Sequence, residues 1–190
     1  MLGGGLLPRK FMFTREEIVK TALDITREKG ISAVTARGLA EKLGSSSKPV
    51  FSIFENMSEL HCAIIEAANR EYSEFTDRYI KSGKYTPYKA SGIAYIFFAK
   101  ENRELFKLLF MRDRSKEIIS ENREELAPII DMIIKNTGMS KEKAYFFHIE
   151  MWLFVHGIAT MAATSYLNWD DEFISNTLTD VYTGLTIRFA

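Results

Sequence analysis

Residues 35–54, TARGLAEKLGSSSKPVFSIF, contain two short helical patterns with a glycine between them. In the first pattern, Thr35 can accept a hydrogen bond from a free backbone amide and so cap a helix. Leu39 and Leu43 then lie on one face of that helix, and Gly44 stops it. Two helices joined by a tight turn that contains glycine form a helix-turn-helix, so this stretch predicts the fold of the N-terminal part.

The second helix of the pair carries a polar face. We predict that Ser45 or Ser46 caps it, and Pro49 falls in its first turn, where the missing N–H has no helical partner to lose. Val50 and Phe54, four residues apart, are predicted to pack inward as the helix continues to Phe54. The outward residues are then short hydroxyls and one lysine, namely Ser46, Ser47, Lys48 and Ser52. Such a face can bind phosphates or base edges in a DNA major groove, but it also fits a helical hairpin with an ordinary polar surface. The residues alone leave both interpretations open.

Helical signals recur through the rest of the chain, and no strand-like alternation persists. Thr14 and Glu17 form a capping box that opens a first helix ending at Gly30, and Ser58 can cap a long fourth one. Further helices are predicted at about residues 88–101, 102–111, 116–136, 140–166 and 171–188. We therefore predict an all-α chain of about nine helices. Its predicted parts are a flexible arm at 1–12, a helix-turn-helix domain at 13–57 and a helical domain at 58–190.

Charge and cysteine content say little about partners but favour a cytoplasmic protein. The net charge is zero, and residues 1–60 carry nine Lys/Arg against seven Asp/Glu, a balance of only +2. The single cysteine, Cys62, excludes an intrachain disulfide and fits a reducing compartment. Residues 151–169 are uncharged, yet they include His156 and several hydroxyls and have acids at both ends, so we predict a core helix and no membrane span.

Catalytic and metal-binding patterns are not found in the sequence. His148 with Glu150, and His61 with Cys62, lack both the spacing of one helix face and a third ligand. No nucleophile and base pattern, phosphate-binding glycine loop or Cys-x-x-Cys is present. We predict a protein without enzymatic activity, metal or cofactor.

Aromatic residues crowd the second half of the chain. They can line an apolar effector pocket, although each of them also fits an ordinary core. The predicted pocket residues are Phe75, Tyr79, Phe97, Phe98, Phe106, Phe110, Phe147, Trp152, Val155 and His156. His156 is either a polar anchor of that pocket or a hydrogen-bonded core histidine.

Residues 14–65 resemble the N-terminal domain of TetR-family transcriptional repressors. The resemblance lies in TREEIVKTALDITREKG (14–30), ISAVTARGLAEKLG (31–44) and SSSKPVFSIFENMSEL (45–60). The shared pattern, in order, is Gly30, Thr35, Ala40, Gly44, Phe51, Phe54, Ser58 and Leu60. A second, shorter resemblance is the W-x-x-x-H-G stretch from Trp152 to Gly157, which matches a C-terminal domain type of that family.

The resemblance implies a homodimer that reads a palindromic operator in double-stranded DNA and is released by a small-molecule effector. It implies pairing through the helices near 140–166 and 171–188, where Gly157 would allow close approach. Thr35 would bind a phosphate and Arg37 would lie near the backbone or bases. The groove-facing residues would be Ser45, Ser46, Ser47, Lys48 and Ser52, and Phe51 would also belong to the DNA-binding set.

Two positions depart from the family pattern. Phe51 stands where a tyrosine hydroxyl usually reaches a phosphate, and Met57 stands where a lysine is common. Both changes remove contacts to the DNA backbone. The alternative function is therefore a helical small-molecule sensor or carrier whose DNA-binding head is weakened.

Overall fold

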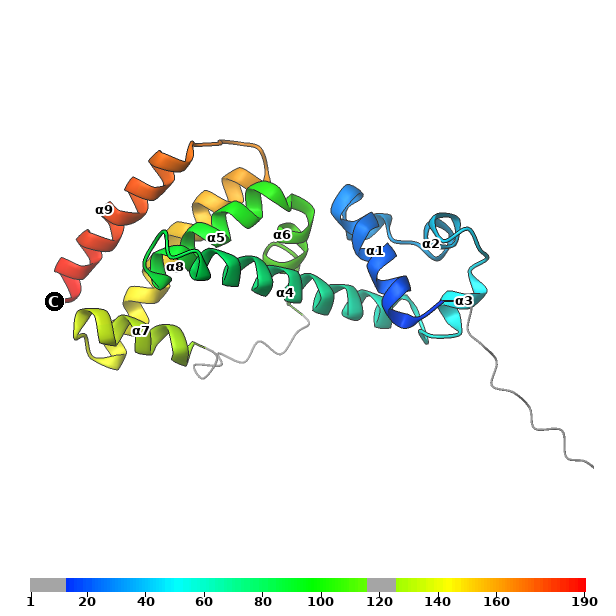
Figure 1. Cartoon of the computed structure of the whole chain (residues 1–190), viewed down its shortest axis with the longest axis horizontal. Coiled ribbons are helices and arrows are strands. Elements are labelled where there is room, and N and C mark those ends of the chain that lie inside the picture. The colour runs from blue at the N-terminus through cyan, green and yellow to red at the C-terminus, as the bar shows by residue number, and fades with distance from the viewer. Residues whose placement is uncertain (1–12, 116–125) are drawn as a thin grey trace, which may run out of the picture. The chain divides into compact units, whose positions relative to one another are not determined.

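The computed structural model describes residues 13–115 and 126–190. The predicted arm at 1–12 and the first part of the predicted helix at 116–136 lie outside these residues. Within them the chain forms nine α-helices and one 3₁₀ turn and no strand (Figure 1). The predicted all-α class with about nine helices is confirmed.

The chain divides into two compact units. The first ends at Ala68 and the second begins at Asn69. This division falls inside the long helix α4, Met57–Lys81. The sequence placed the domain boundary at 57/58, where that helix begins.

The first helix of the N-terminal unit, α1 (Arg15–Lys29), begins and ends as predicted. The Thr14 hydroxyl accepts a hydrogen bond from the Glu17 backbone N–H at 3.1 Å, and the Glu17 carboxylate accepts one from the Thr14 N–H at 2.8 Å. Together these bonds satisfy two amides that a helix start leaves unpaired. Gly30 ends the helix at a φ of 81°, in the region that favours glycine.

The helix-turn-helix consists of α2 (Ala36–Lys42) and α3 (Lys48–Phe51). Thr35 caps α2 by accepting from the Gly38 N–H at 3.0 Å, as predicted. Gly44 turns the chain at a φ of 64°, which a residue with a Cβ adopts only at a cost.

The start and end of α3 differ from the prediction. Ser47, not Ser45 or Ser46, precedes the helix, and its side chain makes no capping bond. Its backbone is already helical, with φ −73° and ψ −12°, whereas a side-chain cap needs an extended residue. The regular helix also ends at Phe51 rather than Phe54, although the Phe54 N–H still donates to the Val50 carbonyl at 2.9 Å.

The core of the N-terminal unit contains the two side chains predicted to pack inward from α3. Val50 and Phe54 are each 1% exposed. The other fully buried apolar residues of this core include Ile18, Ala22, Leu39, Leu60 and Ile64.

The start of α4 is capped differently from the prediction. Asn56, rather than Ser58, accepts a hydrogen bond from the Glu59 N–H at 3.0 Å. The Glu59 carboxylate accepts from the Glu55 N–H at 2.7 Å, so the two side chains satisfy amides on both sides of the helix start. Ser58 already lies inside the helix.

Five helices follow α4 in the C-terminal unit. They are α5 (Pro87–Glu101), α6 (Arg103–Phe110), α7 (Ala127–Thr137), α8 (Lys141–Ala163) and α9 (Asp171–Phe189). Among these five helices, α8 differs most from its predicted end, because it stops at Ala163 and was predicted to run to 166. Gly138 caps α7 in the left-handed region, φ 73°, and so separates α7 from α8.

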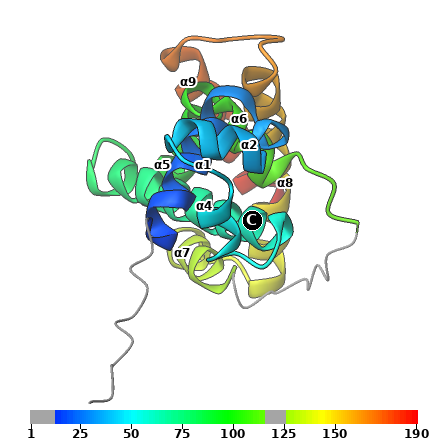
Figure 2. The same ribbon diagram turned by 90° about the vertical axis from the view of Figure 1, so that its right-hand side faces the viewer.

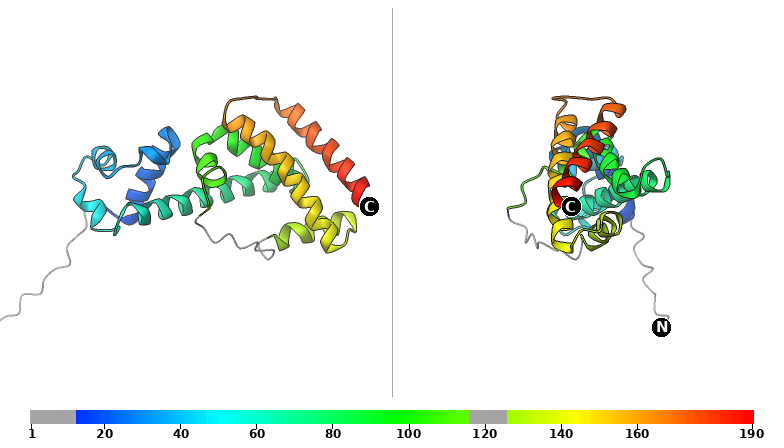
Figure 3. Two further views of the ribbon diagram at one scale, coloured as in Figure 1. Left: turned by 180° about the vertical axis from the view of Figure 1, so that it is seen from behind. Right: turned by 90° about the vertical axis from the view of Figure 1, so that its left-hand side faces the viewer.

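The central helix of this unit is α8. It lies beside α5 and also packs against α6, α7 and α9 (Figures 1 and 2). Figure 3 shows α9 running alongside α8. By length and composition α8 could cross a membrane, but its residues Ala144, Phe147 and Ala159 are fully buried in the unit. This matches the predicted core helix.

Candidate functional site

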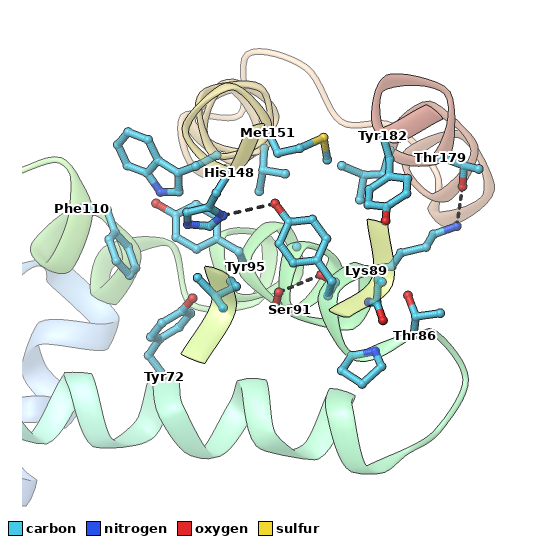
Figure 4. Close-up of a pocket in the computed structure, with 18 residues that line it drawn as sticks. Tyr72, Thr86, Lys89, Ser91, Tyr95, Phe110, His148, Met151, Thr179 and Tyr182 are labelled. Atoms are coloured by element: carbon cyan, nitrogen blue, oxygen red, sulfur yellow. Dashed lines mark hydrogen bonds between the residues drawn. The ribbon is translucent and has the colours of Figure 1, made fainter. Parts of the chain in front are cut away.

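A cavity of about 840 Å³ lies in the C-terminal unit (Figure 4). Residues of α4, α5, α6, α7, α8 and α9 line it. Its volume falls in the range of small-molecule sites, about 300–1,000 Å³. A helical core therefore leaves room here for a ligand.

One end of the cavity is aromatic. The rings of Tyr72 and Tyr95 both pack against Phe110, with ring centroids 5.2 Å and 4.8 Å from it. In Figure 4 these three side chains gather at the α6 side of the cavity. Aromatic walls of this kind favour apolar or aromatic ligand groups through burial and ring contacts.

Two tyrosine–histidine pairs join α5 to α8 along the cavity. The Tyr88 hydroxyl lies 3.2 Å from His148 Nδ1, and the Tyr95 hydroxyl lies 2.9 Å from His156 Nδ1. Burial raises the pKa of both phenols and lowers the pKa of both imidazoles. The phenols are thus protonated and the rings neutral at pH 7, and each phenol can donate to Nδ1 when the ring proton is on Nε2.

Tyr88, Gly92 and Tyr95 bring one face of α5 to the cavity. A Cβ added at Gly92 would lie 3.6 Å from Val155 Cγ2 and 3.9 Å from Leu178 Cδ1, which are ordinary contact distances. The glycine is therefore not forced by a clash, and its missing side chain adds to the free volume between α5, α8 and α9.

The other end of the cavity is polar. Lys89 donates from Nζ to the Thr179 hydroxyl at 2.8 Å, and Thr86, Asn136 and Tyr182 complete this part of the lining. Figure 4 shows Lys89, Thr86 and Thr179 together on the side opposite Phe110. The site thus has an apolar body and a polar mouth.

Three of the ten predicted pocket residues line the cavity, namely Phe110, Trp152 and Val155. Phe98, Phe106 and Phe147 are at most 1% exposed and fill the core instead. The rings of Phe75, Tyr79 and Phe97 pack on one another between α4 and α5 without lining the cavity. His156 does not line the cavity either. It contacts two residues that do, through its hydrogen bond with Tyr95 and its stacking on Trp152, with ring centroids 5.1 Å apart.

The ten predicted pocket residues include none of the lining on α5 and α9. The residues that the prediction did not name as pocket residues include Tyr72, Tyr88, Lys89, Tyr95, His148, Met151, Leu178 and Tyr182. One signal was available, because Tyr88, Gly92 and Tyr95 are spaced at four and three residues and so share a helix face. Two hydroxyl-bearing rings on either side of a glycine indicate a face that is not simply packed core.

The outer face of the helix-turn-helix in the N-terminal unit carries two unpaired cations. Arg37 and Lys48 are exposed, and neither makes an ion pair with another described residue. Ser46, Phe51 and Ser52 are exposed beside them, and Phe51 is 49% exposed although it has no polar atom. Unpaired cations on an exposed helix-turn-helix can neutralise phosphates.

The predicted hydroxyls of this face are not all equally free. Ser52 donates to the Pro49 carbonyl at 2.7 Å, and Ser45 and Ser47 are half-buried. Thr35 is exposed and uses an oxygen lone pair for its cap, so its proton can still be donated outward. A Cβ at Gly38 would lie 3.2 Å from that oxygen, so the glycine leaves room for the cap.

Residues 88–180 match the family model described as tetracyclin repressor-like, C-terminal domain. No curated protein matches the sequence. The matched span contains nearly all of α5 and α6 to α8, most of α9 and most of the cavity lining.

Solved structures share the fold over nearly the whole chain. A TetR variant from Acinetobacter baumannii AYE in complex with minocycline is 17% identical, with a TM-score of 0.62 over 94% of this chain and 99% of that one. A protein of unknown function from Rhodococcus sp. RHA1 is 19% identical, with a TM-score of 0.67 over 98% and 100%. A TetR-like transcriptional regulator from the same organism is 14% identical, with a TM-score of 0.62 over 96% and 97%. At these identities the likeness shows the fold, and the family model relates residues 88–180 to the tetracyclin repressor-like C-terminal domain.

Proposed function

We propose that this protein is a DNA-binding transcriptional regulator, a repressor that a small apolar or amphipathic ligand releases from its operator. The observation that carries the proposal is the cavity of about 840 Å³ in a domain of the tetracyclin repressor-like family. The minocycline complex of the Acinetobacter TetR variant supports a ligand-binding role for such a domain. The cytoplasm is the compartment in which this function would operate.

The exposed cations and hydroxyls of the helix-turn-helix would bind the operator. Arg37 and Lys48 would neutralise phosphates, and Thr35 would donate to one. Ser46, with the neighbouring serines, would lie at the groove. This set agrees with the outward face of α3, where Val50 faces the core.

A homodimer would present two such helices to one palindromic site, about 34–36 Å apart. We infer that α8 and α9, the helices near 140–166 and 171–188, form its interface. Both helices expose large apolar side chains, with Phe146, Leu153, Phe173 and Ile187 between 47% and 74% exposed. Exposed apolar groups on neighbouring helices favour a protein partner, and a second copy satisfies the symmetry of a palindrome.

Ligand binding would act through a difference in affinity between two dimer arrangements. The ligand must bind better to the arrangement whose recognition helices are wrongly spaced for DNA. The route for this coupling would be α4, because it begins soon after α3 and carries Tyr72 of the cavity lining. We propose α4 as the lever.

A selection of genomic fragments bound by the purified protein at low salt tests the regulator role. Bound fragments should share a palindrome, and their affinity should fall steeply with salt. Arg37→Ala and Lys48→Ala should each reduce the slope of log K against log salt by about one per cation removed from the interface. Lys135→Ala on α7 is the matched control and should leave the slope unchanged. If no fragment is enriched and no duplex binds at low salt, the regulator proposal is wrong.

The second candidate function is a sensor or carrier with a weakened DNA-binding head. It is favoured by Phe51, which is 49% exposed and offers no hydroxyl to a phosphate. Such a protein would still bind ligand in the cavity but would show almost no salt-dependent binding to any duplex. The same titration therefore separates the two candidates.

A further inference from the structure

Among the described residues that line the cavity, Lys89 is the one lysine or arginine, and none is Asp or Glu. Its ammonium group donates to the Thr179 hydroxyl at 2.8 Å and lies 5.1 Å from the centre of the Tyr85 ring. It makes no ion pair with any described residue. A half-buried lysine thus faces the cavity without a compensating carboxylate from residues 13–115 or 126–190.

The contact with Thr179 does not use the full hydrogen-bonding capacity of Lys89. Thr179 donates its own proton to the Ser175 carbonyl at 3.0 Å, so its oxygen is fixed as an acceptor for one ammonium proton. An ammonium group has three donors, which leaves two of them without a partner among the described residues. A bound group with acceptor oxygens can take both.

A second lysine lies close to Lys89 but outside the lining, and no described acidic residue lines the cavity. Lys84 Nζ lies 5.2 Å from the same Tyr85 ring, so two ammonium groups flank it. His148, farther along the lining, is neutral at pH 7 because burial lowers its pKa. Asp180 follows Thr179 in sequence but does not line the cavity. An anion is therefore the charge that this mouth stabilises.

The opposite end of the same cavity is the cluster of Tyr72, Tyr95 and Phe110 (Figure 4). Lys89 and Tyr95 are six residues apart on α5, which corresponds to roughly 9 Å along the helix at 1.5 Å per residue. A ligand that reaches both ends needs an apolar or aromatic body of about that length. A molecule of this kind also fits the cavity volume of about 840 Å³.

We propose that the cavity binds an amphipathic ligand with one anionic head, such as a carboxylate, which pairs with Lys89, and with an apolar body directed toward Phe110. This inference rests on the proposed ligand-binding function of the same cavity and specifies its ligand class. The charge pair sets the selectivity, because the aromatic end accepts any apolar group of suitable shape.

Three probes with one carbon skeleton test the charge preference directly: 4-phenylbutanoate, 4-phenylbutanamide and 4-phenylbutylamine. Isothermal titration calorimetry of the full chain at pH 7 should give a dissociation constant for the carboxylate at least tenfold lower than for the amide. The amine should bind most weakly. Lys89→Met should bring the carboxylate and the amide within about twofold of each other, and Lys89→Arg should keep the preference. Lys84→Met is the matched control, because Lys84 flanks the same ring but does not line the cavity, and it should also keep the preference.

The comparison of the three probes on the unmodified chain does not depend on how the variants fold. Equal binding of acid and amide, or tightest binding of the amine, overturns the anionic-head inference and leaves the proposed function standing. Failure of all three probes to bind also overturns the inference for ligands of this size. The regulator role is judged separately by the genomic selection, so the two proposals fail independently.

Discussion

Two helix-interior glycines allow a paired test of where the second copy of the chain binds. Gly92 on α5 faces the cavity, and Gly157 on α8 has no atom within 4 Å of an added Cβ. In a helix interior, glycine to alanine gains roughly 1 kcal/mol of helix propensity. At Gly92 the added methyl also makes ordinary contacts, at 3.6 Å and 3.9 Å, which are worth at most about 0.8 kcal/mol.

Gly92→Ala should therefore raise the free energy of unfolding by about 1–1.8 kcal/mol and the melting temperature by roughly 2–7 °C. Within the single chain the same arithmetic predicts about 1 kcal/mol of stabilisation for Gly157→Ala. If Gly157 lies where two α8 helices approach closely, the added methyl must instead separate them and weaken the dimer.

Sedimentation equilibrium, with calorimetry at several protein concentrations, distinguishes these outcomes. We expect Gly157→Ala to raise the dimer dissociation constant at least tenfold and to make the melting temperature more dependent on concentration. Gly92→Ala should leave the dissociation constant unchanged. If Gly157→Ala stabilises the chain as much as Gly92→Ala does, with association unaltered, then the reasoning that places Gly157 in the interface is refuted.

Three further outcomes follow from the described contacts. Phe106→Ala, at a side chain that is 0% exposed, should lower the free energy of unfolding by about 3–5 kcal/mol in urea denaturation, and a loss below about 1 kcal/mol would contradict its place in the core. Thr35→Ala should cost about 1 kcal/mol by removing the α2 cap, whereas Thr35→Ser should cost less, since serine keeps the accepting oxygen. Because burial lowers the pKa of His148 and His156, the unfolded chain binds more protons, so stability is full above about pH 6.5 and falls as pH drops toward the lowered folded values. Urea midpoints between pH 7.5 and 5 should show this fall, and the double variant His148→Gln/His156→Gln should flatten it; an equal slope in both proteins would argue against neutral buried imidazoles.

Local signals predicted the helix ends well where a single side chain decides them. Thr14, Thr35 and Gly44 act as expected because each needs only its own neighbours within a few residues. The start of α3 could not be predicted in the same way. Three consecutive serines offer equivalent caps, and the backbone at Ser47 continues from the preceding turn in a helical conformation that no side chain caps.

The cavity was harder to predict because composition does not separate a wall from a core. Phe106 and Phe110 lie one helical turn apart on α6, yet Phe106 fills the core and Phe110 lines the cavity. The difference arises from how α4, α5 and α8 pack around them, which is long-range information. Tyr88 and Tyr95 gave a clearer signal than any phenylalanine, because a buried hydroxyl needs a partner and therefore implies a specific neighbour.

The hydrogen bonds of the cavity wall also indicate where its selectivity arises. The hydroxyls of Tyr88 and Tyr95 are already hydrogen-bonded to histidines. A ligand that bonds to them therefore gains little binding free energy, and a ligand that does not bond to them loses little. Lys89 differs, since two of its donors have no partner in the part of the chain that the structure describes, and a ligand without acceptors leaves them unpaired. Binding sites reject an analogue most strongly when it leaves such a group unsatisfied. In this cavity the apolar wall would therefore contribute most of the buried area, and Lys89 would set the preference for a ligand with an anionic group.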